Sequence, residues 1–68
     1  MTKTFFAQLT VTLKTFDDAP MRRHIEESTR RGLCDTIGLE ESSDPRITIS
    51  WEFFPINKKA VCTASILV

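Results

Sequence analysis

Two stretches of the chain alternate apolar and polar residues with a period of two, and this alternation limits the possible folds more than any other feature. In TKTFFAQLTVTLK the apolar residues occupy the odd positions, and Phe6 is the one apolar residue out of step. In RITISWEFFP the apolar odd positions are Ile47, Ile49, Trp51 and Phe53. A period of two places alternate side chains on opposite sides of a strand. The pattern therefore predicts two strands, over about residues 3–14 and 46–54, each with one buried and one solvent-facing side.

The segment between these strands predicts a helix that begins near Ala19. Asp17 or Asp18 can cap its first amides, and Pro20 is tolerated in the first turn, where no amide partner is lost. Charged residues spaced by four alternate in sign along one side: Arg22, Glu26 and Arg30, then Arg23, Glu27 and Arg31. The opposite side carries a thin apolar stripe, made up of Met21, Ile25, Ser28, Thr29, Gly32 and Leu33.

The end of this helix has two candidate positions, both at a glycine. Gly32 could stop the helix or let it approach the sheet closely. We favour an end near Gly38, with Leu39 folding back toward Cys34, although Ile37 would then point away from the stripe.

A turn over residues 55–58, centred on Ile56 and Asn57, leads into a third strand over residues 60–68. Asn57 is the residue expected to take a positive φ there. The chain thus predicts an α+β fold: a single β-α-β-β domain over residues 1–68, with a three-stranded mixed sheet and one helix packed on one face. The small residues of the third strand suit a central position, which favours the order 1-3-2, while 1-2-3 stays open.

Size indicates that this domain does not act alone. A chain of 68 residues buries only about 60% of its unfolded surface, and one thin helix cannot cover the apolar side of three strands. The first strand is also long, and at a sheet edge its backbone groups would offer a template for pairing. We therefore expect a homodimer, formed by edge pairing or sheet packing, or a protein partner.

Composition narrows the function classes. Nine basic and nine acidic residues give zero net charge, which disfavours a nucleic-acid binder. We find no catalytic residues, no metal ligands and no cofactor motif; His24 is isolated, and Cys34 and Cys62 are expected to be reduced. With no signal peptide and no apolar run that could cross a membrane, we expect a cytoplasmic protein without membrane contact.

The candidate binding residues fall into two groups. The first lies on the outward side of the sheet and comprises Phe6, Thr10, Thr48, Phe54 and Leu67; the second is on the helix and comprises Arg22, Arg23 and Arg30, with Arg31 beside them. Exposed aromatic residues on a sheet can bind a protein or stack on bases.

These residues lead to one main hypothesis and two alternatives. The main hypothesis is a small non-enzymatic protein-interaction module, such as a phage- or mobile-element-encoded accessory or inhibitor protein that binds a host protein through an edge strand or the outer sheet face. One alternative is a nucleic-acid binder that uses the helix arginines. The other is a small-ligand-binding oligomer with Trp51 lining an interface pocket.

Overall fold

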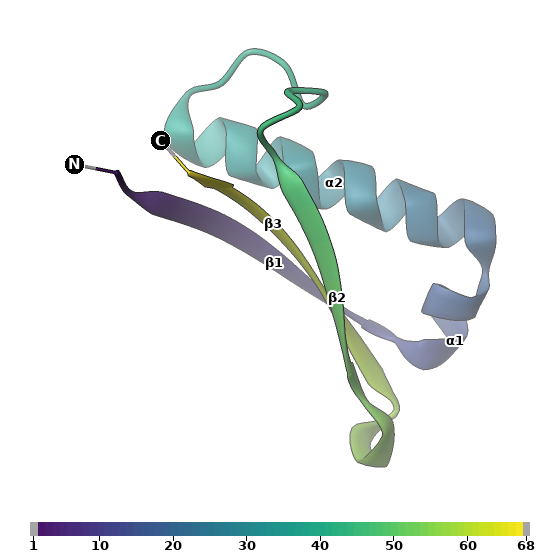
Figure 1. The fold of residues 1–68 in the computed structure, drawn as a ribbon. Helices are drawn as coiled ribbons and strands as arrows, with labels where there is room; N and C mark the ends of the chain where they lie inside the picture. Colours follow the sequence, from purple (N-terminus) through teal and green to yellow (C-terminus); the bar gives the residue numbers. More distant parts are fainter. Residues whose placement is uncertain (1, 68) are drawn as a thin grey trace.

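The computed structural model describes residues 2–67 and contains a three-stranded sheet with a long helix packed against it (Figure 1). The elements in chain order are β1 (Thr4–Thr12), α1 (Leu13–Asp17), α2 (Ala19–Ile37), β2 (Thr48–Phe54), the short 3₁₀ turn η1 (Pro55–Asn57) and β3 (Lys59–Leu67). The predicted β-α-β-β order and α+β class are confirmed.

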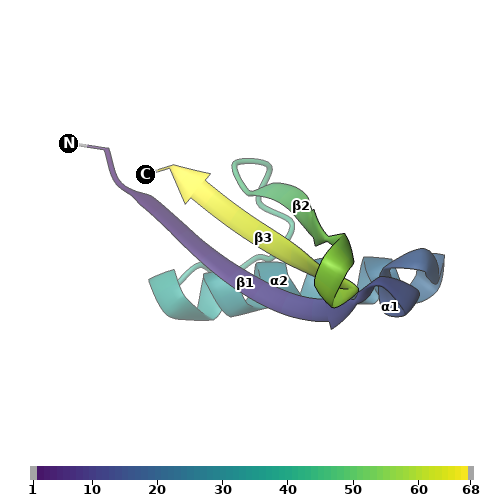
Figure 2. The same ribbon diagram turned by 90° about the horizontal axis from the view of Figure 1, so that it is seen from below.

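The strands lie in the order β1-β3-β2, as favoured from the sequence. Figure 2 shows β3 between the other two strands, with α2 on one side of all three. Both neighbouring pairs are antiparallel, so the sheet is antiparallel where we expected a mixed one. The reason is that β1 and β2, which do share a direction, never touch as neighbours.

Small side chains make β3 the centre of the sheet. Ala60, Cys62 and Ala64 are each 0% exposed and face α2. Because these residues are small, the helix can lie directly above the middle strand. The core continues toward the end of α2, where the buried cluster consists of Leu33, Cys34, Ile47, Ala64 and Ile66.

β1 ends two residues earlier than predicted, because the chain turns into α1 at Leu13. The hydroxyl of Thr12 accepts a hydrogen bond from the amide of Thr15 at 3.2 Å and so caps this short helix. The predicted start of α2 is confirmed: Asp18 caps it by accepting from the amide of Met21 at 3.4 Å, and Pro20 lies in its first turn.

The predicted end of α2 at Gly38 is also confirmed. Gly38 has a φ of 78°, and its amide and that of Leu39 both donate to the carbonyl of Cys34, at 2.8 and 2.9 Å. The expectation for Ile37 is wrong, since this side chain packs against the core. The buried side of α2 is centred on Thr29 and Leu33, which leaves Met21 43% exposed.

The turn between β2 and β3 differs from prediction at one residue. Lys58, and not Asn57, adopts the positive φ, at 53°. Its amide donates to the carbonyl of Pro55 at 3.2 Å, and its carbonyl accepts from the amide of Leu13 at 3.1 Å. These two hydrogen bonds hold Lys58 in the left-handed region and tie the turn to the start of α1.

Candidate functional site

The outer edge of β1 is the longest unpaired backbone segment of the sheet among residues 2–67. Its nine residues pair with β3 in an unbroken register from Thr4–Leu67 to Thr12–Lys59, without a bulge. The strand contains no charged residue and no proline. On its helix side Phe5 and Leu9 remain 36% and 37% exposed. Native sheets usually protect an edge with charge, proline or a bulge, and β1 has none of these.

The outer edge of β2 is better protected. This strand has seven residues, carries Glu52 near its middle, and is followed at once by Pro55. Charge and proline next to an edge both oppose the addition of another strand. The two edges of the sheet are therefore unequal, and β1 is the more open one.

The structure distributes the predicted binding residues of the outward sheet face between its two ends. Phe6 and Thr48 are both register partners of Ser65, and Leu67 lies two residues further along β3. Phe6 is 63% and Leu67 60% exposed, so these two form an apolar pair at one end of the face. Because neighbouring strands bring directly opposed and diagonal side chains within reach, Thr48 belongs to the same place.

Phe54 lies at the other end of the outward face. It is opposite Lys59, which is also the partner of Thr12, six residues along β1 from Phe6. At about 3.4 Å per residue this separation is roughly 20 Å. Thr10 lies between the two ends, in line with Val61. The face is therefore not one continuous apolar surface.

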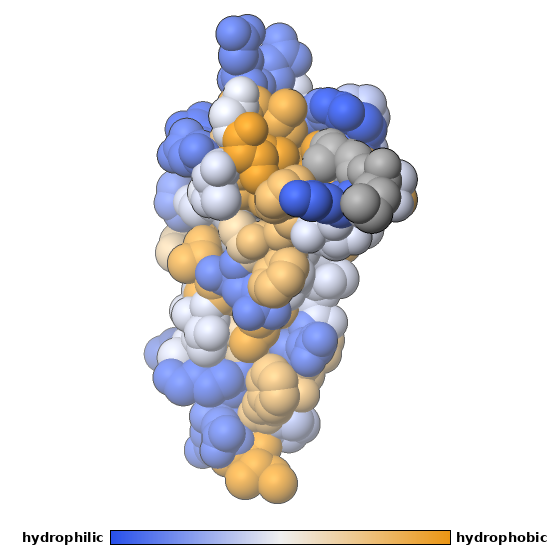
Figure 3. Space-filling model, turned by 90° about the vertical axis from the view of Figure 1, so that its left-hand side faces the viewer, coloured by the Kyte–Doolittle hydropathy of each residue, from blue (hydrophilic) through white to orange (hydrophobic). Residues whose placement is uncertain are grey.

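The apolar surface of the molecule is broken into patches. Seen from the left of Figure 1, apolar patches follow one another down the molecule, separated by hydrophilic side chains, to the lower end, where η1 lies (Figure 3). In η1 the side chain of Ile56 is 98% exposed.

The helix arginines are partly engaged within the protein. The guanidinium of Arg22 lies 5.0 Å from the centroid of the Phe16 ring, and Arg31 forms an ion pair with Glu27 at 3.2 Å. Arg23 is exposed and Arg30 half-buried. The four arginines thus share α2 with acidic residues and do not form an uninterrupted basic surface.

Glu26 does not complete the charge ladder predicted for it. Instead, its carboxylate accepts a hydrogen bond from the indole nitrogen of Trp51 at 2.8 Å. Phe16, from α1, packs edge-to-face on Trp51 and Phe53, with ring centroids 5.0 and 4.8 Å apart. Trp51 is therefore fixed in an aromatic cluster. Phe16 could have been recognised from the sequence, because it breaks the strand alternation just before a helix start.

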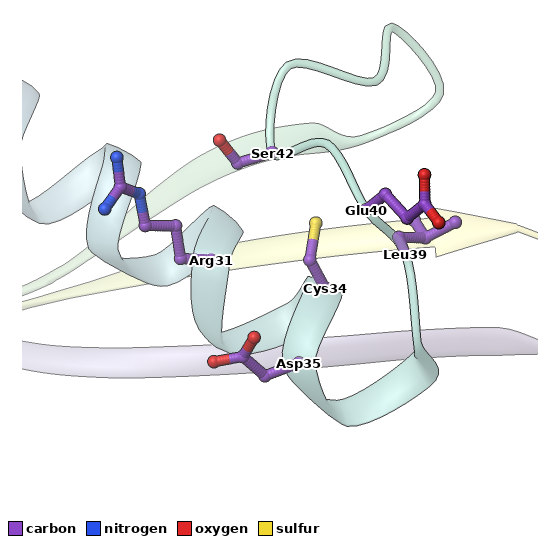
Figure 4. Close-up of a pocket in the computed structure, with 6 residues that line it drawn as sticks. All are labelled: Arg31, Cys34, Asp35, Leu39, Glu40 and Ser42. Carbon is purple, nitrogen blue, oxygen red and sulfur yellow. The ribbon is translucent and has the colours of Figure 1, made fainter.

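A polar hollow of about 410 Å³ lies between the end of α2 and the loop that follows it. It is lined by Arg31, Cys34, Asp35, Leu39, Glu40 and Ser42 (Figure 4). In this view the sulfur of Cys34 points from the helix toward the loop. The thiol donates to the carbonyl of Glu41 at 3.4 Å, and the residue is only 4% exposed. A buried, hydrogen-bonded thiol of this kind holds the loop and is poorly placed to react.

Glu27 anchors the same loop. Its carboxylate accepts from the hydroxyl of Ser42 at 2.6 Å and from Arg31, and these contacts lower the pKa of Glu27, the hydroxyl contributing most. The polar hollow is therefore the space between the end of α2 and a loop that these hydrogen bonds hold in place.

A second hollow, of about 550 Å³, lies at the opposite end of the sheet, between the start of α1 and the β2–β3 turn. Its lining residues are Thr12, Leu13, Lys14, Pro55, Asn57, Lys58 and Lys59. The sequence did contain a signal for this cluster: the lysines flank the end of β1 and the β2–β3 turn, which the order 1-3-2 brings to the same end of the sheet. We did not predict this hollow.

The described residues provide few other reactive groups. Both cysteines are free and buried, and burial raises the pKa of the Cys62 thiol. Within residues 2–67, no three His, Cys, Asp or Glu side chains are grouped so that they could hold a metal ion. Over the same range, no helix combines the length and apolar character needed to cross a membrane.

Comparisons with known proteins do not assign the chain to a family or a function. No protein-family model matches the chain, and neither a curated protein nor a solved structure is significantly similar to it. Any functional proposal therefore depends on the geometry described above.

Proposed function

We propose that this protein is a small non-enzymatic interaction module that binds another polypeptide by strand addition at the outer edge of β1. The observation that supports the proposal most directly is the nine-residue, bulge-free, uncharged edge. Strand addition uses the backbone groups of such an edge for affinity and the flanking side chains for specificity. Phe5 and Leu9 on the helix side and Phe6 on the outward side flank this edge.

The composition of β1 favours a second copy of the same chain as the polypeptide that pairs with this edge. Two antiparallel β1 strands related by a two-fold axis would bring each strand against itself. Charged edge strands suffer like-charge repulsion in that arrangement, whereas β1 has no charge to repel. The dimer would join two three-stranded sheets into one of six strands and would cover part of Phe5 and Leu9.

The outward pair of Phe6 and Leu67, with Thr48 beside it, is the further surface proposed for a host protein. Edge pairing uses the backbone groups of β1, so the outward face that carries this pair would stay open to solvent above the joined sheet. An accessory or inhibitor protein encoded by a phage or mobile element is the setting that we propose for this activity, in keeping with the absence of a catalytic signature among the described residues.

A matched pair of substitutions tests the use of the β1 edge. Thr10→Lys and Thr48→Lys make the same change on the same exposed face, one on each edge strand. A lysine on an edge strand opposes strand addition. We expect Thr10→Lys to abolish self-association in sedimentation equilibrium and Thr48→Lys to leave it intact. Equal behaviour of the two variants, or a wild-type protein that is monomeric at millimolar concentration, would refute self-pairing.

Binding of a host protein is tested separately. Tagged wild-type protein, Phe6→Asp and Phe54→Asp are used to recover partners from lysate at low and high salt. Loss of a salt-resistant partner in Phe6→Asp alone assigns it to the Phe6 and Leu67 end. Retention in both variants, with native circular dichroism, excludes the outward face.

A further inference from the structure

The hollow between α1 and the β2–β3 turn has a mainly apolar lining, to which several lysines contribute. The chain has four lysines, and three of them, Lys14, Lys58 and Lys59, line this one hollow. They come from two segments that lie far apart in the sequence and meet at the end of the sheet. None of the five arginines of the chain lines it. The charge distribution is therefore uneven although the net charge is zero.

These three lysines have no internal counter-charge. The ion pairs present within residues 2–67 are Arg31–Glu27 and Arg46–Asp44, and neither involves a lysine. No carboxylate lines the hollow. Three lysines around one hollow, with no acidic residue in its lining, give a positive potential there that a bound anion would offset.

The backbone around the hollow is held in place by several contacts. Thr12 and Lys59 are register partners, and the amide of Leu13 donates to the carbonyl of Lys58 at 3.1 Å. Lys58 takes a φ of 53°, a conformation that costs free energy for a non-glycine residue. The hydroxyl of Thr12 already accepts from the amide of Thr15, so the lysine ammonium groups and the Asn57 side chain are the polar groups left for a ligand.

We propose that this hollow binds the phosphate group of a small organic phosphate. Ammonium groups donate hydrogen bonds and supply point charges, and three of them suit a multiply charged phosphate better than a single carboxylate. The volume of about 550 Å³ exceeds the needs of a bare phosphate and lies within the range of small-molecule sites. Leu13 and Pro55 provide apolar contact for the organic part. This site is independent of the β1 edge.

The test is an amide NMR titration of the full chain at constant ionic strength with pyrophosphate, ATP and adenosine. We expect pyrophosphate and ATP to shift the amides of residues 12–14 and 56–59, ATP to bind more tightly than pyrophosphate, and adenosine to have no effect. Replacing all three lysines by Gln should remove the shifts. Each single Lys→Gln change at residues 14, 58 and 59 should weaken binding about tenfold.

Lys3→Gln is the matched control, because it removes the same charge from the one lysine outside the hollow. It should leave the affinity for ATP unchanged. The proposal is overturned if adenosine binds as well as ATP, if the triple variant keeps the shifts, or if Lys3→Gln weakens binding as much as the other substitutions. Native amide dispersion in each variant shows that a loss of binding is not a loss of fold.

Discussion

The two ends of the helix–sheet interface are packed with different kinds of side chain. At the C-terminal end of α2, aliphatic residues dominate, and Leu33 is 0% exposed. At the N-terminal end, Phe16, Trp51 and Phe53 meet edge-to-face, and Phe53 is still 48% exposed. The small residues of β3 are buried at both ends, whereas large side chains are completely buried only at the C-terminal end of α2. Elsewhere, directional contacts between half-exposed groups hold the layers together.

Leu33→Ala gives the largest expected effect, since it removes a fully buried side chain from the aliphatic end. Truncations of this kind cost about 2–5 kcal/mol of unfolding free energy. Urea unfolding followed by circular dichroism measures the loss. Ile56→Ala, at a residue that is 98% exposed, is the control and should change stability by less than about 0.5 kcal/mol. Similar losses in both variants would contradict the assignment of the core.

Phe16→Ala tests the aromatic end and should cost less. It removes two edge-to-face contacts, each worth about 0.5–1.5 kcal/mol beyond burial. The fluorescence of Trp51, the one tryptophan in the chain, should also change because its ring loses a neighbour. Phe6→Ala makes the same substitution on the outward face and should leave the Trp51 spectrum unaltered. A loss larger than that of Leu33→Ala would reverse the order of the two ends.

Glu26→Gln tests the same aromatic end of the interface and should cause a smaller loss of stability. The amide oxygen can still accept from the indole of Trp51, but the hydrogen bond is no longer charge-assisted. We expect a loss of about 1 kcal/mol in urea unfolding. Glu52→Gln removes the same charge from an exposed strand residue and should be close to neutral. A double variant with Phe16→Ala would show whether the two contacts are coupled.

The smallest effect is expected at the loop beyond the aliphatic end, and it depends on pH. Hydrogen bonds from Arg46 lower the pKa of Asp44 from its ordinary value of 3.8 to about 2. A carboxyl group with a lowered folded-state pKa stabilises the fold above its unfolded pKa. This stabilisation is present above pH 3.8 and is lost as the pH falls through about 2.

Asp44→Asn should therefore flatten the acid limb of the stability profile between these two pH values and lower stability slightly at pH 7. Urea unfolding at a series of pH values measures both. Asp35→Asn, on the exposed side of α2, is the matched control. An unchanged acid limb in Asp44→Asn would show that the Arg46 contact does not persist in solution.

Most of the fold was predictable because periodicity and capping are local properties of the chain. The alternation in β1 and β2, the caps at Asp18 and Gly38, and the small residues of β3 all led to the observed arrangement. The details that were predicted wrongly depend on contacts between segments that are distant in the sequence. Lys58 takes the positive φ because Leu13 binds its carbonyl, and Glu26 binds Trp51 because strand and helix meet there.

The candidate sites were less predictable than the fold. The outward residues were assigned to the correct side, but the register separates Phe54 from Phe6, which a list of alternating residues does not reveal. The lysine hollow requires three residues from two distant segments to meet, and only the strand order brings them together. Its residues have ordinary turn and strand roles when each is considered alone.

The pairing of Thr4 with Leu67 places the beginning of β1 beside the end of β3. A short connection between these strands would make them a hairpin and give a backbone-cyclised or circularly permuted protein with the same sheet. New chain ends could then be opened in the loop between α2 and β2. Closing the chain restricts the unfolded ensemble far more than the folded one, so the cyclic form should unfold at a higher temperature.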